Sequence, residues 1–172
     1  MIEKIISGGQ TGADQGGLEA GKELGLETGG TAPQMYMTEL GPCLKLRYTY
    51  GLKEGVYDPK TYPKRTRKNI VDSDATVIFG LMGEPGSKLT CNICVDLGKP
   101  WVVNPNRLDF QCLIAWHSVK VLNVAGNRES RNPGIQLRVR NFLVDALKTR
   151  EPSGTFPQAT KDIPAGDGYG VG

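Results

Sequence analysis

The sequence predicts an α/β fold, a doubly wound and mostly parallel sheet of about five strands. Short apolar runs alternate with segments of helical periodicity, and glycine-rich polar turns follow several of those runs. The chain has 172 residues, of which 38% are hydrophobic and 23% charged, so it can bury the core of an ordinary globular domain. We expect a single domain over residues 1–149 and a C-terminal tail rich in glycine and proline over residues 150–172.

The chain opens with a strand, a tight loop and a helix. Ile5 and Ile6 form an apolar run typical of a strand that is buried on both faces. The loop Gly8–Asp14 has almost no side-chain bulk, and Leu18 and Leu24 then recur at helical spacing. Such a loop presents bare backbone N–H groups at a helix N-terminus, where anions bind, although glycine is equally common in purely structural turns.

An irregular excursion over residues 32–62 follows a second short strand around Glu27–Thr31. Its apolar residues are scattered among glycines and prolines. A loop of this length is uncommon in a compact domain unless it is functional or disordered. Because the segment contains five tyrosines, we expect it to be ordered and packed over one edge of the sheet as a lid or a subunit contact.

Regular alternation returns after the excursion, and Ala75–Gly80 is the clearest strand of the chain. The other expected elements are a helix at 65–72, a glycine-rich loop at Gly83–Thr90 leading into a helix that ends near Gly98, a strand at Pro100–Val103, a helix at Leu108–Trp116, a more peripheral strand at Val119–Val124, a polar loop at Ala125–Gly134 and a helix at Ile135–Lys148.

Three polar loops are expected at one edge of this sheet, because parallel strands all end at the same edge. If Ala75–Gly80 lies beside the first strand, the strand order is 2-1-3-4-5 and a crevice opens between Gly8–Asp14 and Gly83–Thr90. Doubly wound proteins bind ligands at such a switch point. The residues expected to bind a ligand and its phosphate are Gly8, Gly9, Gln10, Thr11, Gly12, Ala13, Asp14, Arg67, Gly86, Ser87, Lys88, Leu89, Thr90, Arg128 and Ser130.

Two of these side chains have alternative interpretations. Arg65, Arg67 and Lys68 either form a solvated helix face, or one arginine of this group, for which we take Arg67, reaches a phosphate with its guanidinium group. Asp14 either caps its helix, accepts a sugar hydroxyl or holds a magnesium ion, and we do not expect Mg²⁺.

The remaining reactive residue types do not form a catalytic or metal site. The only histidine, His117, precedes a strand and therefore lies at the opposite edge of the sheet. Cys91 and Cys94 have redox spacing, but two thiols on a helix that faces the sheet are the better interpretation. We assign no catalytic residue and no metal ligand.

The overall composition restricts the partners. A net charge of +3 is too small to indicate nucleic acid, and no apolar run approaches membrane-spanning length. The chain enters its first strand without a leader segment, and four cysteines are too few for a disulfide scaffold. We therefore expect a cytoplasmic protein.

Three motifs resemble those of a known family. They are I-I-S-G-G-Q-T-G-A-D-Q-G at Ile5–Gly16, R-T-R-K-N-I-V-D-S-D-A-T-V-I at Arg65–Ile78 and L-N-V-A-G-N-R-E-S-R-N-P-G-I at Leu122–Ile135. Together they resemble the molybdenum cofactor carrier family, over roughly residues 2–148. That family belongs to a Rossmann-like superfamily with the lysine-decarboxylase-like proteins and the Lonely Guy phosphoribohydrolases.

The resemblance implies a Rossmann-like homo-oligomer, a dimer or a tetramer, that binds a phosphorylated small molecule. The ligand would be molybdenum cofactor (molybdopterin) or a nucleotide, with Gly8–Asp14 and Gly86–Thr90 around its phosphate and pterin. One departure favours binding over catalysis. The phosphoribohydrolases carry a glutamate three residues after the threonine of the second loop, and Ile93 stands at that position here.

Two alternatives stay open. One is an enzyme acting on nucleoside monophosphates through Asp14, Arg67 and Glu129. The other is a single-stranded nucleic-acid-binding module, although we do not expect a nucleic-acid partner.

Overall fold

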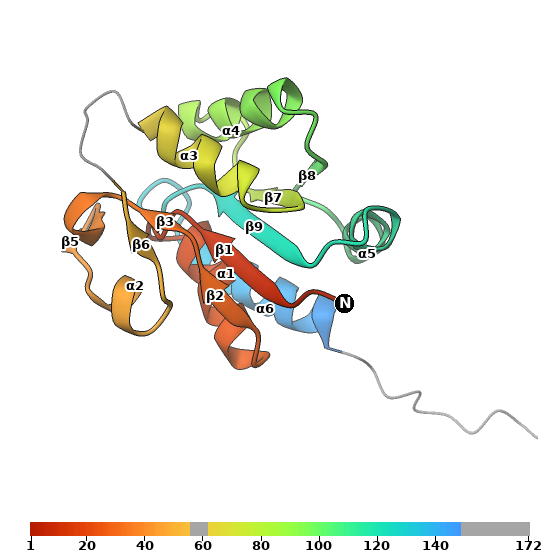
Figure 1. Cartoon of the computed structure of the whole chain (residues 1–172), viewed down its shortest axis with the longest axis horizontal. Helices are drawn as coiled ribbons and strands as arrows, with labels where there is room; N and C mark the ends of the chain where they lie inside the picture. The colour runs from red at the N-terminus through yellow and green to blue at the C-terminus, as the bar shows by residue number, and fades with distance from the viewer. Residues whose placement is uncertain (56–61, 149–172) are drawn as a thin grey trace, which may run out of the picture.

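A computed structural model places a parallel five-stranded sheet between two layers of helices (Figure 1). It describes residues 1–55 and 62–148. The tail expected at 150–172 therefore lies outside the described residues. The strands of the sheet are β1 (Lys4–Ser7), β2 (Glu27–Gly29), β7 (Ala75–Phe79), β8 (Trp101–Val103) and β9 (Val121–Gly126), and the main helices are α1 (Ala13–Glu23), α3 (Tyr62–Val71), α4 (Pro85–Asp96), α5 (Arg107–Trp116) and α6 (Ile135–Leu147).

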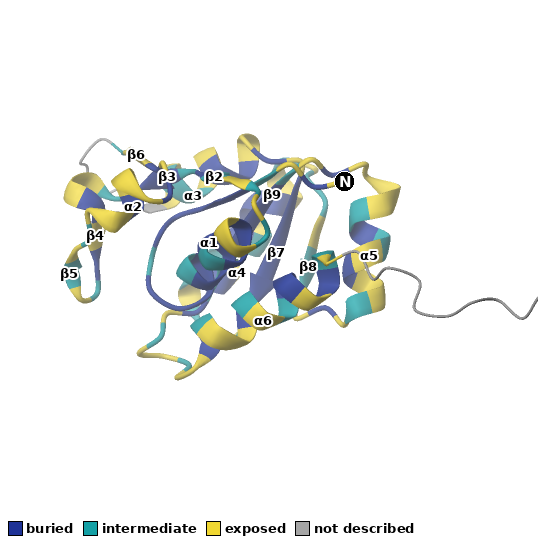
Figure 2. Ribbon diagram, turned by 90° about the horizontal axis from the view of Figure 1, so that it is seen from below, coloured by how far each residue is buried: buried dark blue, intermediate teal, exposed yellow. Residues whose placement is uncertain are grey.

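The two helix layers cover opposite faces of the sheet. Helices α1 and α6 lie on one face, and α3 and α4 lie on the other (Figure 1). The central strands are buried between them, while the outer faces of the helices are exposed (Figure 2). The α/β doubly wound fold expected from the alternation of elements is thus confirmed. Within the described ranges, no helix is long and apolar enough to span a lipid bilayer.

The order of the strands differs from the prediction. The observed order is β2-β1-β9-β7-β8, so β9, the last of the described strands, lies between β1 and β7. The predicted order 2-1-3-4-5 and the peripheral position of Val119–Val124 are therefore wrong. The alternation that suggested a peripheral strand comes from Lys120 and Asn123, but Lys120 precedes β9 and Asn123 is 2% exposed. Its side-chain amide donates to Thr76 Oγ1 at 3.2 Å, so a polar residue occupies the sheet interior without an unsatisfied group.

Counting from β9 gives a familiar topology. With β9 as the first strand, followed by β1, β2, β7 and β8, the observed order reads 3-2-1-4-5. This is the order of the mononucleotide-binding Rossmann fold, in which the connections reverse direction between strands 1 and 4. The switch point therefore lies between β9 and β7. It does not lie between β1 and β7, as the sequence prediction assumed.

The excursion after β2 is ordered over its described part, residues 32–55. It has a small core of its own, formed by Leu18, Ala32, Tyr36, Leu46, Tyr50 and Leu52. This core packs on α1 and holds the excursion against one edge of the sheet, as expected, while residues 56–61 lie outside the described ranges. Its elements are β3 (Thr31–Ala32), η1 (Gln34–Tyr36), β4 (Met37–Thr38), β5 (Gly41–Pro42), α2 (Lys45–Tyr48) and β6 (Lys53–Glu54).

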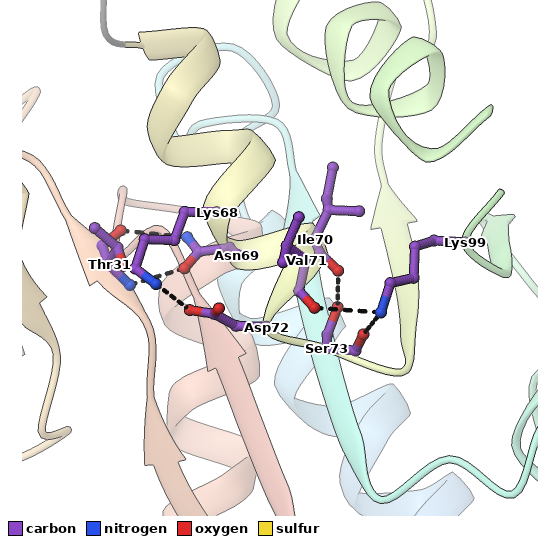
Figure 3. A network of polar contacts seen from close by, with 8 residues as sticks. All are labelled: Thr31, Lys68, Asn69, Ile70, Val71, Asp72, Ser73 and Lys99. Atoms are coloured by element: carbon purple, nitrogen blue, oxygen red, sulfur yellow. Dashed lines mark hydrogen bonds and ion pairs between the residues drawn. The ribbon is translucent and has the colours of Figure 1, made fainter. Parts of the chain in front are cut away.

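Helix α3 is tied to the excursion by one amide side chain (Figure 3). Asn69 Oδ1 accepts from the Thr31 N–H at 2.8 Å, and Asn69 Nδ2 donates to the Thr31 carbonyl at 3.2 Å. At the other end of the network, Lys99 Nζ donates to the carbonyls of Val71 and Ser73, at 3.2 and 2.6 Å. These contacts fix both the position and the C-terminal end of α3.

We expect Asn69→Leu to lower the free energy of unfolding by about 2–4 kcal/mol, because it leaves both backbone groups of Thr31 buried without their partner. Lys68→Ala is the matched control on the same helix. It removes an exposed ion pair with Asp72, at 2.8 Å, and should cost less than about 0.5 kcal/mol. Urea denaturation measures both, and equal losses would contradict a clamping role for Asn69.

Candidate functional site

A small cavity lies at the carboxyl edge of the sheet, near the ends of β1 and β9. It encloses about 40 Å³, which is room for a few water molecules or one tetrahedral oxyanion. Four segments far apart in the sequence form its wall. The lining residues are Gly8, Gln10, Asp14, Arg65, Thr66, Asn69, Gly86, Thr90, Asn123, Ala125, Gly126 and Arg128.

The loop after β1 is folded back on the first turn of α1. Asp14 Oδ2 accepts from the Gln10 N–H at 3.2 Å. Ser7 Oγ accepts from the Gly9 N–H at 3.0 Å and donates to the Asp14 carbonyl at 3.2 Å. Gly12, at the start of the helix, has no side chain to cap it, and the Asp14 carboxylate holds the loop instead. These bonds set the backbone of Gly8 at the cavity wall.

Asp14 is a buried carboxyl between cationic groups. It is 8% exposed, and burial raises its pKa to about 6 against the opposing influence of Arg65, the Gln10 N–H and Arg128. The Arg65 guanidinium donates to the Gly8 carbonyl at 3.3 Å. The cavity therefore combines two guanidinium groups with a carboxyl that changes its charge near pH 6.

A larger crevice adjoins this cavity at the switch point between β9 and β7. It encloses about 310 Å³, the size of a small-molecule site. The crevice shares Gly86, Gly126 and Arg128 with the small cavity. Its lining residues are Glu84, Pro85, Gly86, Ser87, Gly126, Asn127, Arg128 and Arg131.

The structure brings about half of the expected ligand-binding residues together in these two spaces. Gly86–Thr90, expected as a loop, forms the first turns of α4. The expected residues that line the small cavity are Gly8, Gln10, Asp14, Gly86, Thr90 and Arg128, and Ser87 lines the crevice.

Several expected residues lie elsewhere. Arg67 and Lys88 are exposed and line neither space, and Leu89 packs against the cluster of Ile70, Ile93 and Cys94. The backbone of Gly12 and Ala13 packs against the turn after β9, since the Ala13 N–H donates to the Asn127 carbonyl at 3.0 Å. Gly9 lies under the excursion, where an added Cβ would come within 2.7 Å of Leu52.

Arg65 and Asn69 line the cavity although neither was among the expected site residues. They lie four positions apart and therefore on one face of α3, which is the face toward the cavity. Arg67 is two positions from each of them and points away. The signal that could have found them is this helical phase, since Ile70 also lies on the inner side.

Thr11 and Ser130 are held by a residue that the sequence did not suggest. The carboxylate of Glu39 accepts from both hydroxyl groups and from the Ser130 N–H, the last at 3.2 Å. Partial burial raises the pKa of Glu39. The hydrogen bonds from Ser130 and Thr11, together with the charge of Arg128, have a larger opposite effect, so the pKa of Glu39 is lowered overall. The hairpin β4–β5 is thereby fastened to the loops after β1 and β9.

Other candidate reactive groups have structural roles. Glu129 accepts from the N–H groups of Gly134 and Gln136, the latter at 3.1 Å, at the start of α6. Burial raises the pKa of Cys94 to about 11, which makes it a poor nucleophile, and His117 is exposed at the end of α5. Among the described residues, no group of three or more His, Cys, Asp and Glu side chains is placed to hold a metal ion.

The strand order and the position of the crevice define a Rossmann-like protein with an open space at its switch point. The chain belongs to the circularly permutated YpsA SLOG family, whose pattern matches residues 5–147. Permutation agrees with the topology, because β9, which is strand 1 of the 3-2-1-4-5 order, comes after the other four strands of the sheet in the described sequence.

A solved structure supports this assignment. The chain is similar to a protein of Syntrophus aciditrophicus SB described as a "putative molybdenum carrier protein", with 34% identity and a TM-score of 0.74. The similarity covers 86% of this chain and 96% of that one, and it confirms the resemblance seen in the three motifs. A search of curated proteins found no match.

Proposed function

We propose that this protein binds a phosphorylated small molecule, with the phosphate in the small cavity and the remainder of the ligand in the crevice. The position of Arg128 carries the proposal, because this residue lines both spaces and lies at their junction. Arg65 lines the same cavity. Two guanidinium groups beside bare glycine backbone suit the oxygen atoms of a phosphate.

The chemistry of the ligand follows from both spaces. A crevice of about 310 Å³ accommodates a heterocycle such as a pterin or a nucleobase. Molybdenum cofactor, a pterin that carries a phosphate, has both parts and agrees with the description of the Syntrophus aciditrophicus relative. A nucleotide has the same two parts. We propose molybdenum cofactor first and a nucleotide second, as cargo that the protein binds without changing it.

A second candidate function is hydrolysis of a nucleoside monophosphate at its N-glycosidic bond. The buried Asp14 favours it, because a carboxyl with a pKa of about 6 in a ligand cavity suits general acid–base catalysis. Against it, Glu129 is engaged at the start of α6, and Ile93 lies in an apolar cluster. Release of free base from a panel of nucleoside monophosphates would support the enzyme and contradict simple carriage.

Mass spectrometry of the natively purified protein tests the ligand class directly. We expect a copurifying phosphorylated heterocycle. Arg128→Ala should lower the affinity for that molecule about tenfold to a hundredfold in a calorimetric titration, since it removes charge-assisted hydrogen bonds to a phosphate. Arg67→Ala is the matched control, because Arg67 is an exposed arginine on the same helix as Arg65 but lines neither space. Equal losses in both variants would contradict the proposed phosphate position.

We propose that the protein works as a homo-oligomer in the cytoplasm. All four cysteines are free thiols, which suits a reducing compartment. Leu108 and Trp116 of α5 are 68% and 80% exposed, and side chains of this kind are common in subunit contacts.

A further inference from the structure

We propose that Glu39 fills a second anion subsite beside the phosphate cavity and thereby limits the ligand to a single phosphate at that end. Glu39 would then be a specificity-determining residue. This inference rests on the proposed function, because it takes the small cavity as the place of the first phosphate.

The groups around the Glu39 carboxylate are those that usually hold a phosphate. Two hydroxyl groups, Thr11 Oγ1 and Ser130 Oγ, donate to it, and the Ser130 N–H adds a third bond at 3.2 Å. These donors come from the loops after β1 and β9, which also supply the wall of the cavity. An anion at this place accepts the hydrogen bonds that these donors make. In this protein the anion is the carboxylate of Glu39.

The subsite adjoins the phosphate cavity. Gln10 lines the cavity, lies next to Thr11 in the sequence, and accepts from the Glu39 N–H at 2.9 Å through its Oε1. Arg128 lines the cavity two positions before Ser130, and its charge acts on the carboxyl groups of both Asp14 and Glu39. One guanidinium group is therefore shared by two neighbouring anion positions, as between the two phosphates of a diphosphate.

Glu39 is presented by a short, internally bonded turn. Thr38 Oγ1 donates to the Gly41 carbonyl at 2.8 Å and accepts from the Leu40 N–H at 3.2 Å. The strands on either side of the tip pair through Met37–Pro42 and Thr38–Gly41. Because the tip is held in this way, the carboxylate occupies the subsite as a fixed group. A second phosphate would have to displace it and would meet its negative charge.

Titrations with inorganic phosphate and pyrophosphate, followed by ³¹P NMR, test the inference on the full chain. The wild type should bind pyrophosphate no more tightly than phosphate. Glu39→Ala should raise the affinity for pyrophosphate relative to phosphate about tenfold or more, because it frees three donors and removes one negative charge. Glu39→Gln keeps the subsite filled and should leave pyrophosphate excluded. Glu54→Ala, in the same excursion but bonded to the Met35 N–H, should behave as the wild type.

The outcomes separate the two proposals. If Glu39→Ala folds and its preference between the two anions equals that of the wild type, the Glu39 subsite is refuted. If Glu39→Ala does not fold, the test rests on the wild type alone. Tighter binding of pyrophosphate than of phosphate by the wild type then refutes the Glu39 subsite. Phosphate binding that is absent from the wild type, or unchanged in Arg128→Ala, refutes the phosphate cavity itself, whatever the Glu39 variants do.

Discussion

Gly126→Ala is expected to lower the free energy of unfolding by more than about 3 kcal/mol, because it combines backbone strain with overpacking. Gly126 ends β9 with a φ of +155°. An added Cβ would lie 2.0 Å from the Phe79 carbonyl oxygen and 2.8 Å from the Ala13 Cβ. Neither neighbour can move freely, since Phe79 belongs to β7 and Ala13 starts α1. The missing side chain lets three segments meet at the cavity wall.

Gly25→Ala is the control that separates conformational strain from close contact. Gly25 has a φ of +70°, yet nothing lies within 4 Å of the position of its Cβ. Gly25→Ala should therefore lower the free energy of unfolding by only about 1–2 kcal/mol, which is the cost of an alanine with a left-handed backbone. Guanidinium denaturation with comparison of midpoints and m-values measures both variants. Equal losses would show that the approach of β7, β9 and α1 at Gly126 is not as tight as described.

The fold class could be predicted because apolar runs and helical periodicity report burial locally. Ile5, Val77 and Ile78 are all fully buried in their strands, as continuous apolar runs suggest. Strand order could not be predicted in the same way, since it depends on pairing between distant segments. The polar Lys120 and Asn123 made β9 look peripheral, and only the bond from Asn123 to Thr76 shows how Asn123 fits the centre of the sheet.

The candidate site could be predicted as far as its residues lie in loops that follow strands. Gly8, Gln10 and Arg128 are such residues, and the parallel sheet brings them to one edge. Helical phase decided between Arg65 and Arg67, and it could have been applied to the sequence. Glu39 could not be found, because it belongs to an excursion whose path follows no regular period and is set by packing of its own small core.

Asp14→Asn should stabilise the protein at pH 7–8 by up to about 3 kcal/mol, the equivalent of a pKa raised from 3.8 to about 6. In the folded state Asp14 keeps its proton to a higher pH than in the unfolded state. The folded state therefore binds more protons between about pH 4 and 6, and its stability falls as the pH rises through that window. Above it the loss is complete and constant. Asparagine removes this dependence, while its carbonyl oxygen can still accept from the Gln10 N–H.

Asp74→Asn provides a control of opposite sign. The N–H groups of Val121 and Lys120, at 2.8 and 2.9 Å, hold the pKa of Asp74 below its usual value, so its contribution is present at neutral pH and lost on acidification. The unfolding free energies of the wild type and Asp14→Asn should therefore converge below about pH 4. Those of the wild type and Asp74→Asn should converge only below the lowered pKa of Asp74. At neutral pH the unfolding free energies of the variants should differ from that of the wild type, upward for Asp14→Asn and downward for Asp74→Asn.

Unchanged stability of Asp14→Asn at pH 8 would contradict a buried, destabilising charge at Asp14. A higher free energy of unfolding in Asp14→Asn would show that the fold does not require the Asp14 carboxyl. A carboxyl that lowers stability at a cavity is expected where it serves the binding of a ligand.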